Sequence, residues 1–146
     1  MSRLHALLEF SPMAKMSRLQ RRLDRIPMEV RAAAATEALL GALGLSEAMK
    51  QVVPVDEGDV KASIRVERGK RGDRFYVKAG GPKTTKPVRE AGKGNAPSYD
   101  YANASEFGTS RQPAQPWFYP TWRRNKKQIK AGIEHEIRKA VRKSNG

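Results

Sequence analysis

Apolar residues recur every three or four positions over two long stretches of the chain, and each stretch predicts an amphipathic helix. The first stretch follows Pro27, a residue that suits the first position of a helix, and runs to about Gln51. We expect this helix to end at Val53, because Pro54 disfavours helical backbone in the residue before it. Its predicted apolar stripe consists of Val30, Ala34, Ala38, Gly41, Leu45, Ala48 and Met49.

The second periodic stretch lies at the C-terminal end of the sequence. It follows Pro120 and predicts a closing helix that reaches about Lys143. Its predicted packing stripe repeats every fourth residue: Ile129, Ile133, Ile137 and Val141. Lys and Arg side chains occupy most of the remaining surface of this helix.

The segment between the two helices changes to shorter patterns. A helical turn is expected over residues 59–62, with Asp56 as a plausible cap. Apolar and charged residues then alternate over residues 64–68, and residues 75–79 return as a second strand after a polar turn. Residues 80–97 are rich in Gly, Pro and Lys and predict a long exposed loop that contacts a partner.

A third extended segment is expected over Tyr99–Phe107, followed by a turn-rich connection to Pro116. The order helix, strands, helix predicts an α+β fold, in which a long N-terminal helix and a C-terminal helix pack on a small antiparallel sheet with a long inserted loop. The length predicts one domain over residues 1–146. Its expected parts are an arm at 1–12, a helical region at 13–53, strands at 60–107 with the loop at 80–97, and the closing helix at 120–144.

The formal net charge of +14 is distributed unevenly along the sequence. Residues 111–146 carry ten Lys or Arg against two Glu, so the excess is concentrated on the closing helix. Such a surface faces a polyanion or an acidic protein, or is simply a solvated helix face. The candidate residues for a DNA channel or an acidic partner are Lys126, Lys127, Lys130, Lys139 and Arg142.

The sequence offers no pattern that indicates catalysis, a metal or a cofactor. It contains no cysteine, and its two histidines, His5 and His135, lack metal-ligand spacing. The residue four positions after His135 is Lys139, which is not a ligand for the same ion. We therefore expect a protein that is not an enzyme and holds no cofactor. Neither a signal peptide nor a membrane span is expected from the apolar stretches.

Four aromatic residues fall within six positions just before the closing helix: Trp117, Phe118, Tyr119 and Trp122. Prolines on both sides restrict this segment, and large aromatic side chains often anchor protein interfaces. The same side chains could instead fasten the closing helix to the sheet. Together with Glu106 and Phe107 they form the candidate interface set, and Glu106 should find a cation or a backbone donor because burying a lone carboxylate is costly.

Two segments of the sequence carry a family resemblance. One is the Pro-Val-Asp-x-Gly-x-Val-Lys-x-Ser run at residues 54–63, which follows the long helix. The other is Tyr-Ala at 101–102, Glu-Phe-Gly-Thr at 106–109, Pro-Ala-Gln-Pro at 113–116 and Pro120. In order and spacing they resemble the phage neck, head–tail joining or tail-completion proteins typified by gene product ten of coliphage Hong Kong 97. The resemblance spans roughly residues 19–144.

That resemblance implies a virion protein assembled in the host cytoplasm. It implies a subunit of the head-to-tail connection, built as a ring of six or twelve copies between portal-side connector and tail proteins. Double-stranded DNA would pass nearby without sequence recognition, and no membrane would be involved. The alternative from composition is a stand-alone basic protein that binds nucleic acid, which predicts stacking or base-contacting side chains on the basic surface.

Overall fold

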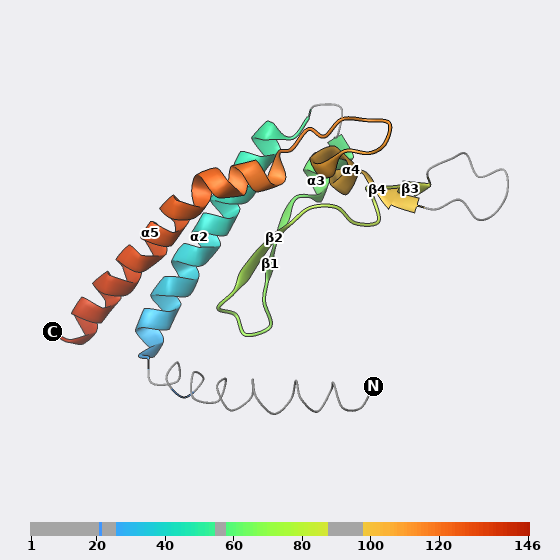
Figure 1. Ribbon diagram of the computed structural model, residues 1–146. Coiled ribbons are helices and arrows are strands. Elements are labelled where there is room, and N and C mark those ends of the chain that lie inside the picture. The colour runs from blue at the N-terminus through green and yellow to red at the C-terminus, as the bar shows by residue number, and fades with distance from the viewer. Residues whose placement is uncertain (1–20, 22–25, 55–57, 88–97) are drawn as a thin grey trace, which may run out of the picture.

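The computed structural model describes residues 21, 26–54, 58–87 and 98–146. Two long helices dominate it, α2 (Met28–Val52) and α5 (Phe118–Ser144). They run side by side in opposite directions, so that the C-terminal end of α5 lies near the start of α2 (Figure 1). The predicted helix after Pro27 is confirmed, and its C-cap residue is Val53 as Pro54 requires. The expected arm at 1–12 and the Asp56 cap lie outside the described residues.

Two small antiparallel hairpins complete the fold with two short helices. The first hairpin pairs β1 (Arg65–Arg68) with β2 (Phe75–Lys78), as the alternating pattern predicted, and lies against α2. The second pairs β3 (Thr85–Pro87) with β4 (Ser98–Asp100) and projects away from the helices (Figure 1). The short helices are α3 (Gly58–Ser63) and α4 (Tyr101–Phe107). The α+β class is confirmed, although the strands form two separate sheets.

Two expectations for the central segment are wrong. Residues 80–97 are not all loop, because residues 85–87 form β3. Residues 99–107 are not one extended segment, because a helix begins at Tyr101. The physical reason is the side chain of Asp100, which accepts a hydrogen bond from the Ala102 amide at 2.9 Å and caps the new helix.

The closing helix begins at Phe118, two residues earlier than expected, and its packing stripe holds only in part. Ile129 packs against the core, whereas Val141 is 39% exposed. A repeat of four residues advances about 400° on a helix with about 100° per residue, so each successive stripe position turns about 40° away from the contact. By Val141 the stripe has reached the solvent, and Ala140 lies beside α2 in its place.

The core lies at one end of the molecule rather than along the whole helix pair. It joins the C-terminal part of α2 to α3, α4 and the start of α5. Its buried members are Leu45, Met49, Val53, Val60, Ile64, Ala102 and Trp117. Of the predicted α2 stripe, Val30, Leu45 and Met49 are buried, while Ala34, Ala38, Gly41 and Ala48 are half-buried. Outside this cluster, most residues of α2 and α5 are half-buried or exposed.

α2 and α5 are in close contact at Gly41, where the absence of a side chain leaves room. A Cβ atom added to Gly41 would lie 2.8 Å from Cγ2 of Ile129 on α5. Because a real methyl group does not fit at that distance, glycine sets the spacing of the two helices here. None of the described helices combines the length and apolar content that a membrane span requires.

Candidate assembly interface

A buried carboxylate links α4 to the start of α5. Glu106 is 7% exposed, and its carboxylate accepts hydrogen bonds from the backbone amides of Trp117, Phe118 and Tyr119 at 2.7, 2.9 and 3.0 Å. These amides belong to the N-cap residue Trp117 and to the first turn of α5, where no side-chain cap comes from the N-cap residue itself. The predicted backbone donor for Glu106 is therefore confirmed, and the carboxylate caps α5 from a distant part of the chain.

A second carboxylate links α4 to the projecting hairpin. Asp100 accepts a hydrogen bond from the Thr84 hydroxyl at 2.8 Å and another from the Gly81 amide at 3.0 Å, in addition to capping α4. Thr84 is fully buried. Gly80 has a φ of +88°, and a Cβ at this position would collide with the Asp100 carboxylate. Asp100 thus fixes the base of the β3–β4 hairpin on the same short helix that positions α5.

The candidate aromatic residues separate into buried and exposed groups. Trp117 is 1% exposed, and its ring packs edge-on against Phe118 at 5.6 Å between ring centroids. Phe107, Tyr119 and Trp122 are 65%, 47% and 40% exposed. Trp117 therefore anchors α5 to the core, whereas the other three rings present apolar surface to the solvent. Within the described part of the chain, the indole Nε1–H of Trp117 is buried and has no acceptor.

One exposed aromatic residue was missed from the sequence. Tyr76 on β2 is 47% exposed and borders the same groove as Tyr119 and Trp122. The sequence placed Tyr76 in the second strand, and only the fold brings this residue beside the start of α5. The Asp100 cap was also missed, although an Asp directly before a run of helix-compatible residues is a sequence signal for a helix start.

The groove beside these rings has a volume of about 390 Å³. Its floor comes from α2 and its walls come from β2 and from the first half of α5. The lining residues are Ala38, Ala42, Leu45, Met49, Phe75, Tyr76, Val77, Lys78, Phe118, Tyr119, Trp122, Ile129 and Ile133. Lys78 is the one charged residue in that lining, and no acidic residue contributes to it.

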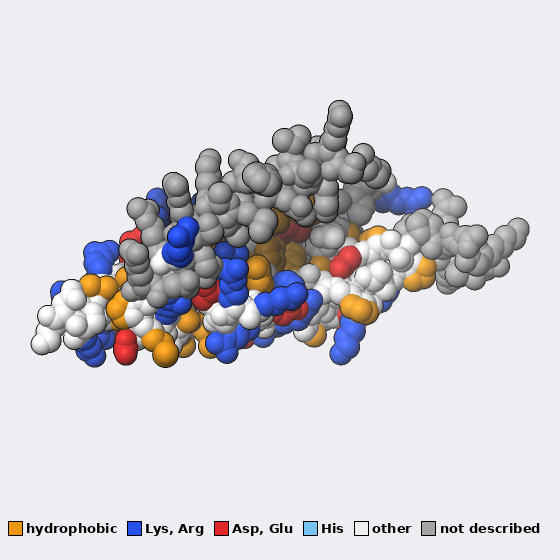
Figure 2. Space-filling model, turned by 90° about the horizontal axis from the view of Figure 1, so that it is seen from below, with side chains coloured by type: hydrophobic (Ala, Val, Ile, Leu, Met, Phe, Trp, Pro, Cys, Tyr) orange, Lys and Arg blue, Asp and Glu red, His pale blue; other side chains and the backbone are white. Residues whose placement is uncertain are grey.

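The basic candidates on α5 are exposed to solvent, as the sequence predicted. Lys126, Lys127, Lys130, Lys139 and Arg142 are all exposed. Lys130 pairs with Glu134 at 3.8 Å and Lys139 with Glu136 at 3.6 Å, both at the surface. Figure 2 shows that Lys and Arg side chains spread over both the helical part and the hairpin part of one face rather than gathering in a single patch.

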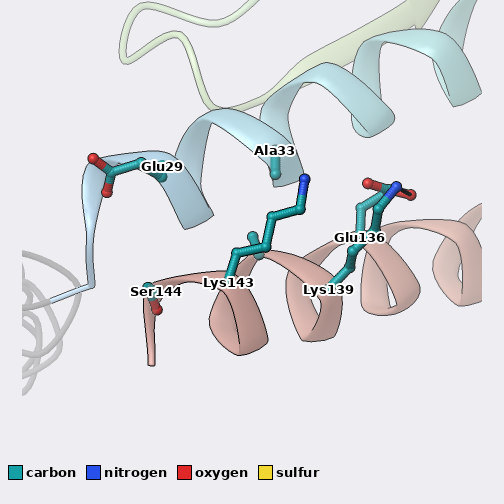
Figure 3. A pocket seen from close by; sticks show the side chains of 7 residues that line it. Glu29, Ala33, Glu136, Lys139, Lys143 and Ser144 are labelled. Carbon is teal, nitrogen blue, oxygen red and sulfur yellow. Dashed lines mark ion pairs between the residues drawn. The ribbon is translucent and has the colours of Figure 1, made fainter. Parts of the chain in front are cut away.

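A second depression, of about 550 Å³, lies where the start of α2 meets the end of α5. Glu29 and Ala33 contribute from α2, while Glu136, Lys139, Lys143 and Ser144 contribute from α5 (Figure 3). Lys139 and Lys143 extend toward α2 across the gap. No cluster of three or more His, Cys, Asp or Glu side chains that could hold a metal ion is found in the described ranges.

Taken together, these features describe an α+β protein with a capped joint, exposed aromatic rings and a long pair of helices. A comparison with family models gives the class a name. Residues 17–108, more than half of the chain, match the HK97-gp10-like family, described as "Bacteriophage HK97-gp10, putative tail-component". The chain belongs to this family of phage tail components. No curated protein and no solved structure matches the chain.

The family match fits one part of the resemblance seen in the sequence and leaves another part outside. The Pro54–Ser63 run and the segment from Tyr101 to Gly108 fall within the matched residues. The Pro113–Pro116 segment, the four aromatic residues and α5 lie beyond them. The family assignment therefore rests on α2, the hairpins and α4, and the features of α5 are properties of this chain's own structure.

Proposed function

We propose that this protein is a ring-forming subunit of the phage head-to-tail connection, in a neck or tail-completion layer. It joins the portal-side connector to the tail and surrounds the channel through which DNA passes. The observation that carries the proposal is the exposed aromatic surface of Phe107, Tyr119 and Trp122 on a scaffold that belongs to a family of phage tail components. Aromatic rings held on a rigid joint are typical anchors of protein interfaces.

The shape of the molecule supports an assembled form. Of the 27 residues in α5, only Thr121 is buried. Leu40 and Leu43 on α2 are 57% and 45% exposed. Most of the surface of this long helix is half-buried or exposed, so contacts with other subunits are a natural way to cover it.

In the proposed ring each copy contacts the next through two different surfaces, because a closed ring of identical subunits uses head-to-tail contacts. Six copies are expected, with twelve as the alternative. The neighbours above and below are head-closure or connector proteins and tail proteins. The exposed cations of α5 then face either double-stranded DNA, which they contact without reading its sequence, or an acidic neighbouring ring.

Particles from a phage that lacks this gene test the proposal. We expect filled heads and separate tails, with joining restored when the purified wild-type protein is added to the mixture. Electron microscopy counts joined particles, and plaque titre counts infectious ones. Joined and infectious particles in the absence of the protein would contradict the proposal.

A further inference from the structure

The free edge of β2 borders the aromatic groove. Four consecutive residues of β2, from Phe75 to Lys78, line this groove. Since successive side chains of a strand point to opposite faces, a groove lined by consecutive residues runs along the edge of the strand. β1 pairs with the other edge of β2, and β1 and β2 are the only strands of this sheet in the described part of the chain.

The hairpin register shows which main-chain groups point into the groove. The Gly69 amide donates to the Arg74 carbonyl at 2.7 Å, and the pairs Glu67–Tyr76 and Arg65–Lys78 continue the same ladder. In an antiparallel ladder, hydrogen-bonded pairs alternate with pairs whose amides and carbonyls point outward. The main-chain groups of Phe75 and Val77 therefore face away from β1, toward the groove.

The charge around the groove selects the kind of partner. Lys126 on α5 lies on the same helix face as Trp122 and Ile129, which are four residues before and three residues after it. On the opposite wall stands Lys78, which pairs with Glu67 at 2.6 Å, but Glu67 also serves Arg65 at 2.8 Å, so cations exceed acids there. Within the described residues, no acidic side chain pairs with Lys126.

From these three observations we infer that the β2 edge binds an extended, acidic segment of a neighbouring virion protein as an added strand. Its main chain would pair with Phe75 and Val77, its apolar side chains would enter the groove against Tyr119 and Trp122, and its carboxylates would meet Lys78 and Lys126. A second copy of this chain fits less well, because its net charge is +14. The inference rests on the proposed function, because that function makes the partner a neighbouring virion protein.

Proline substitution on opposite edges of one hairpin tests the added strand. Val77 and Val66 are register partners, and the amides of both point away from the ladder. Val77→Pro removes a donor on the groove edge, whereas Val66→Pro removes the matching donor on the far edge, and neither breaks a bond between β1 and β2. Each variant is supplied as full-length protein to a phage that lacks the gene, and the copies retained per purified particle are measured by quantitative mass spectrometry.

We expect Val77→Pro to lower retention by about tenfold, because it removes one hydrogen bond and places a ring in the path of the added strand, while Val66→Pro stays close to wild type. Lys126→Glu should also lower retention, and Lys70→Glu, with the same charge change at the hairpin turn, should not. If wild-type protein is retained in particles but Val77→Pro and Val66→Pro are retained equally well, this inference alone is overturned. Absence of wild-type protein from the particles would overturn the proposed function and this inference together.

Amide hydrogen exchange provides a second readout that does not depend on how well the proline variant folds. In the free wild-type protein the Val77 amide should exchange much faster than the Tyr76 amide, and in the particle both should be protected. A Val77 amide that exchanges equally fast in the free and assembled states would overturn the inference. Protection of Val77 in the purified protein alone, together with self-association in ultracentrifugation, would overturn it in favour of a second copy.

Discussion

Among single residues, two carboxylates fix the start of α5 and the base of the second hairpin. The Glu106 carboxylate accepts hydrogen bonds from three backbone amides at the start of α5. The Asp100 carboxylate accepts hydrogen bonds from two backbone amides and one hydroxyl, in α4 and at the base of the second hairpin. Glu106 caps α5 from a different helix. Asp100 caps α4 and also holds the base of the second hairpin. Their identities were visible in the sequence, but most of their partners were not, because the Trp117 and Gly81 amides lie 11 and 19 residues away.

Replacing Glu106 tests its role as a cap. Glu106→Ala should lower the free energy of unfolding by about 2–4 kcal/mol, because one buried and two partly buried amides lose a charged acceptor. Glu106→Gln keeps one acceptor oxygen in place and should cost roughly half as much. Chemical denaturation of both variants measures the difference. A loss below about 0.5 kcal/mol for Glu106→Ala would show that water replaces the carboxylate without cost.

The two tryptophans should separate folding from assembly. Trp117→Ala removes a fully buried side chain and should lower the free energy of unfolding by about 3–5 kcal/mol. Trp122→Ala changes a side chain that is 40% exposed, so we expect a smaller effect on unfolding and a clear loss of incorporation into particles. Thermal unfolding and particle composition measure the two effects. Normal incorporation of Trp122→Ala into particles would show that this ring is not part of the interface.

The Glu67 carboxylate gives a pH-dependent signal on the first hairpin. Hydrogen bonds from Lys78 and Arg65 lower the pKa of Glu67 below its ordinary value of 4.5. A lowered pKa means that the contribution to stability is present above the ordinary pKa and is lost as the pH falls through the folded-state value. An NMR titration should show the pKa of Glu67 rising in Lys78→Met. An unchanged pKa in that variant would assign the shift to Arg65 alone.

At the scale of elements, the sequence predicted the types of the long elements better than their packing. The Pro27 and Pro54 boundaries placed α2 within a residue or two, because proline acts on local backbone geometry. The first hairpin also followed from local alternation. The extended assignment of residues 101–107 was wrong because the run has few strong helix signals apart from the Asp100 cap.

The residues through which α5 contacts α2 could not be predicted from the pattern of α5 alone. The four-residue repeat of Ile129, Ile133, Ile137 and Val141 indicated one stripe, but the stripe turns around the helix while its contact with α2 does not. The contact passes instead through small or polar positions such as Gly132, beside Glu37, and Ala140. Such a path depends on the crossing of two helices, and the pattern of one helix does not specify it.

Two glycines in α2 test this helix contact. Gly41→Ala should lower the stability of the fold, because the new methyl group meets Ile129, whereas a methyl group at Gly44 would meet no neighbouring element within 4 Å. Gly44→Ala should raise the free energy of unfolding by about 0.5–1 kcal/mol through helix propensity alone. Denaturation curves of both variants provide the comparison. Equal stabilisation by the two substitutions would show that α2 and α5 do not meet at Gly41.

For the molecule as a whole, the candidate interface residues were selected from the sequence, whereas the groove beside them was not. α4 and the start of α5 bring these six residues together, and the exposed ones lie on one side of the capped joint. Tyr76 and the β2 edge join that surface only through the tertiary fold. The basic residues of α5 are exposed, as the sequence predicted, because Lys and Arg side chains extend beyond the apolar contacts of the helix.

The basic surface separates two kinds of partner. Reversing Lys126, Lys127 and Lys130 to Glu leaves the core unchanged, so the monomer should fold normally. If the surface faces DNA, rings should form and DNA retention should fall. If it faces protein, the connection should fail to assemble. Both effects should weaken with added salt, because exposed charges are screened over about 8 Å at physiological ionic strength. Normal assembly and normal infectivity would identify the patch as a solvated face.

We propose that several copies of this chain form a closed ring at the junction of head and tail. The most direct measurement is a reconstruction of that junction by electron cryomicroscopy, with the copies per particle counted by mass spectrometry. We expect density for α2 and α5 repeated around the tail axis, six times or twelve times, with Trp122 in a contact between proteins. A single copy per particle, or a location away from the junction, would contradict it.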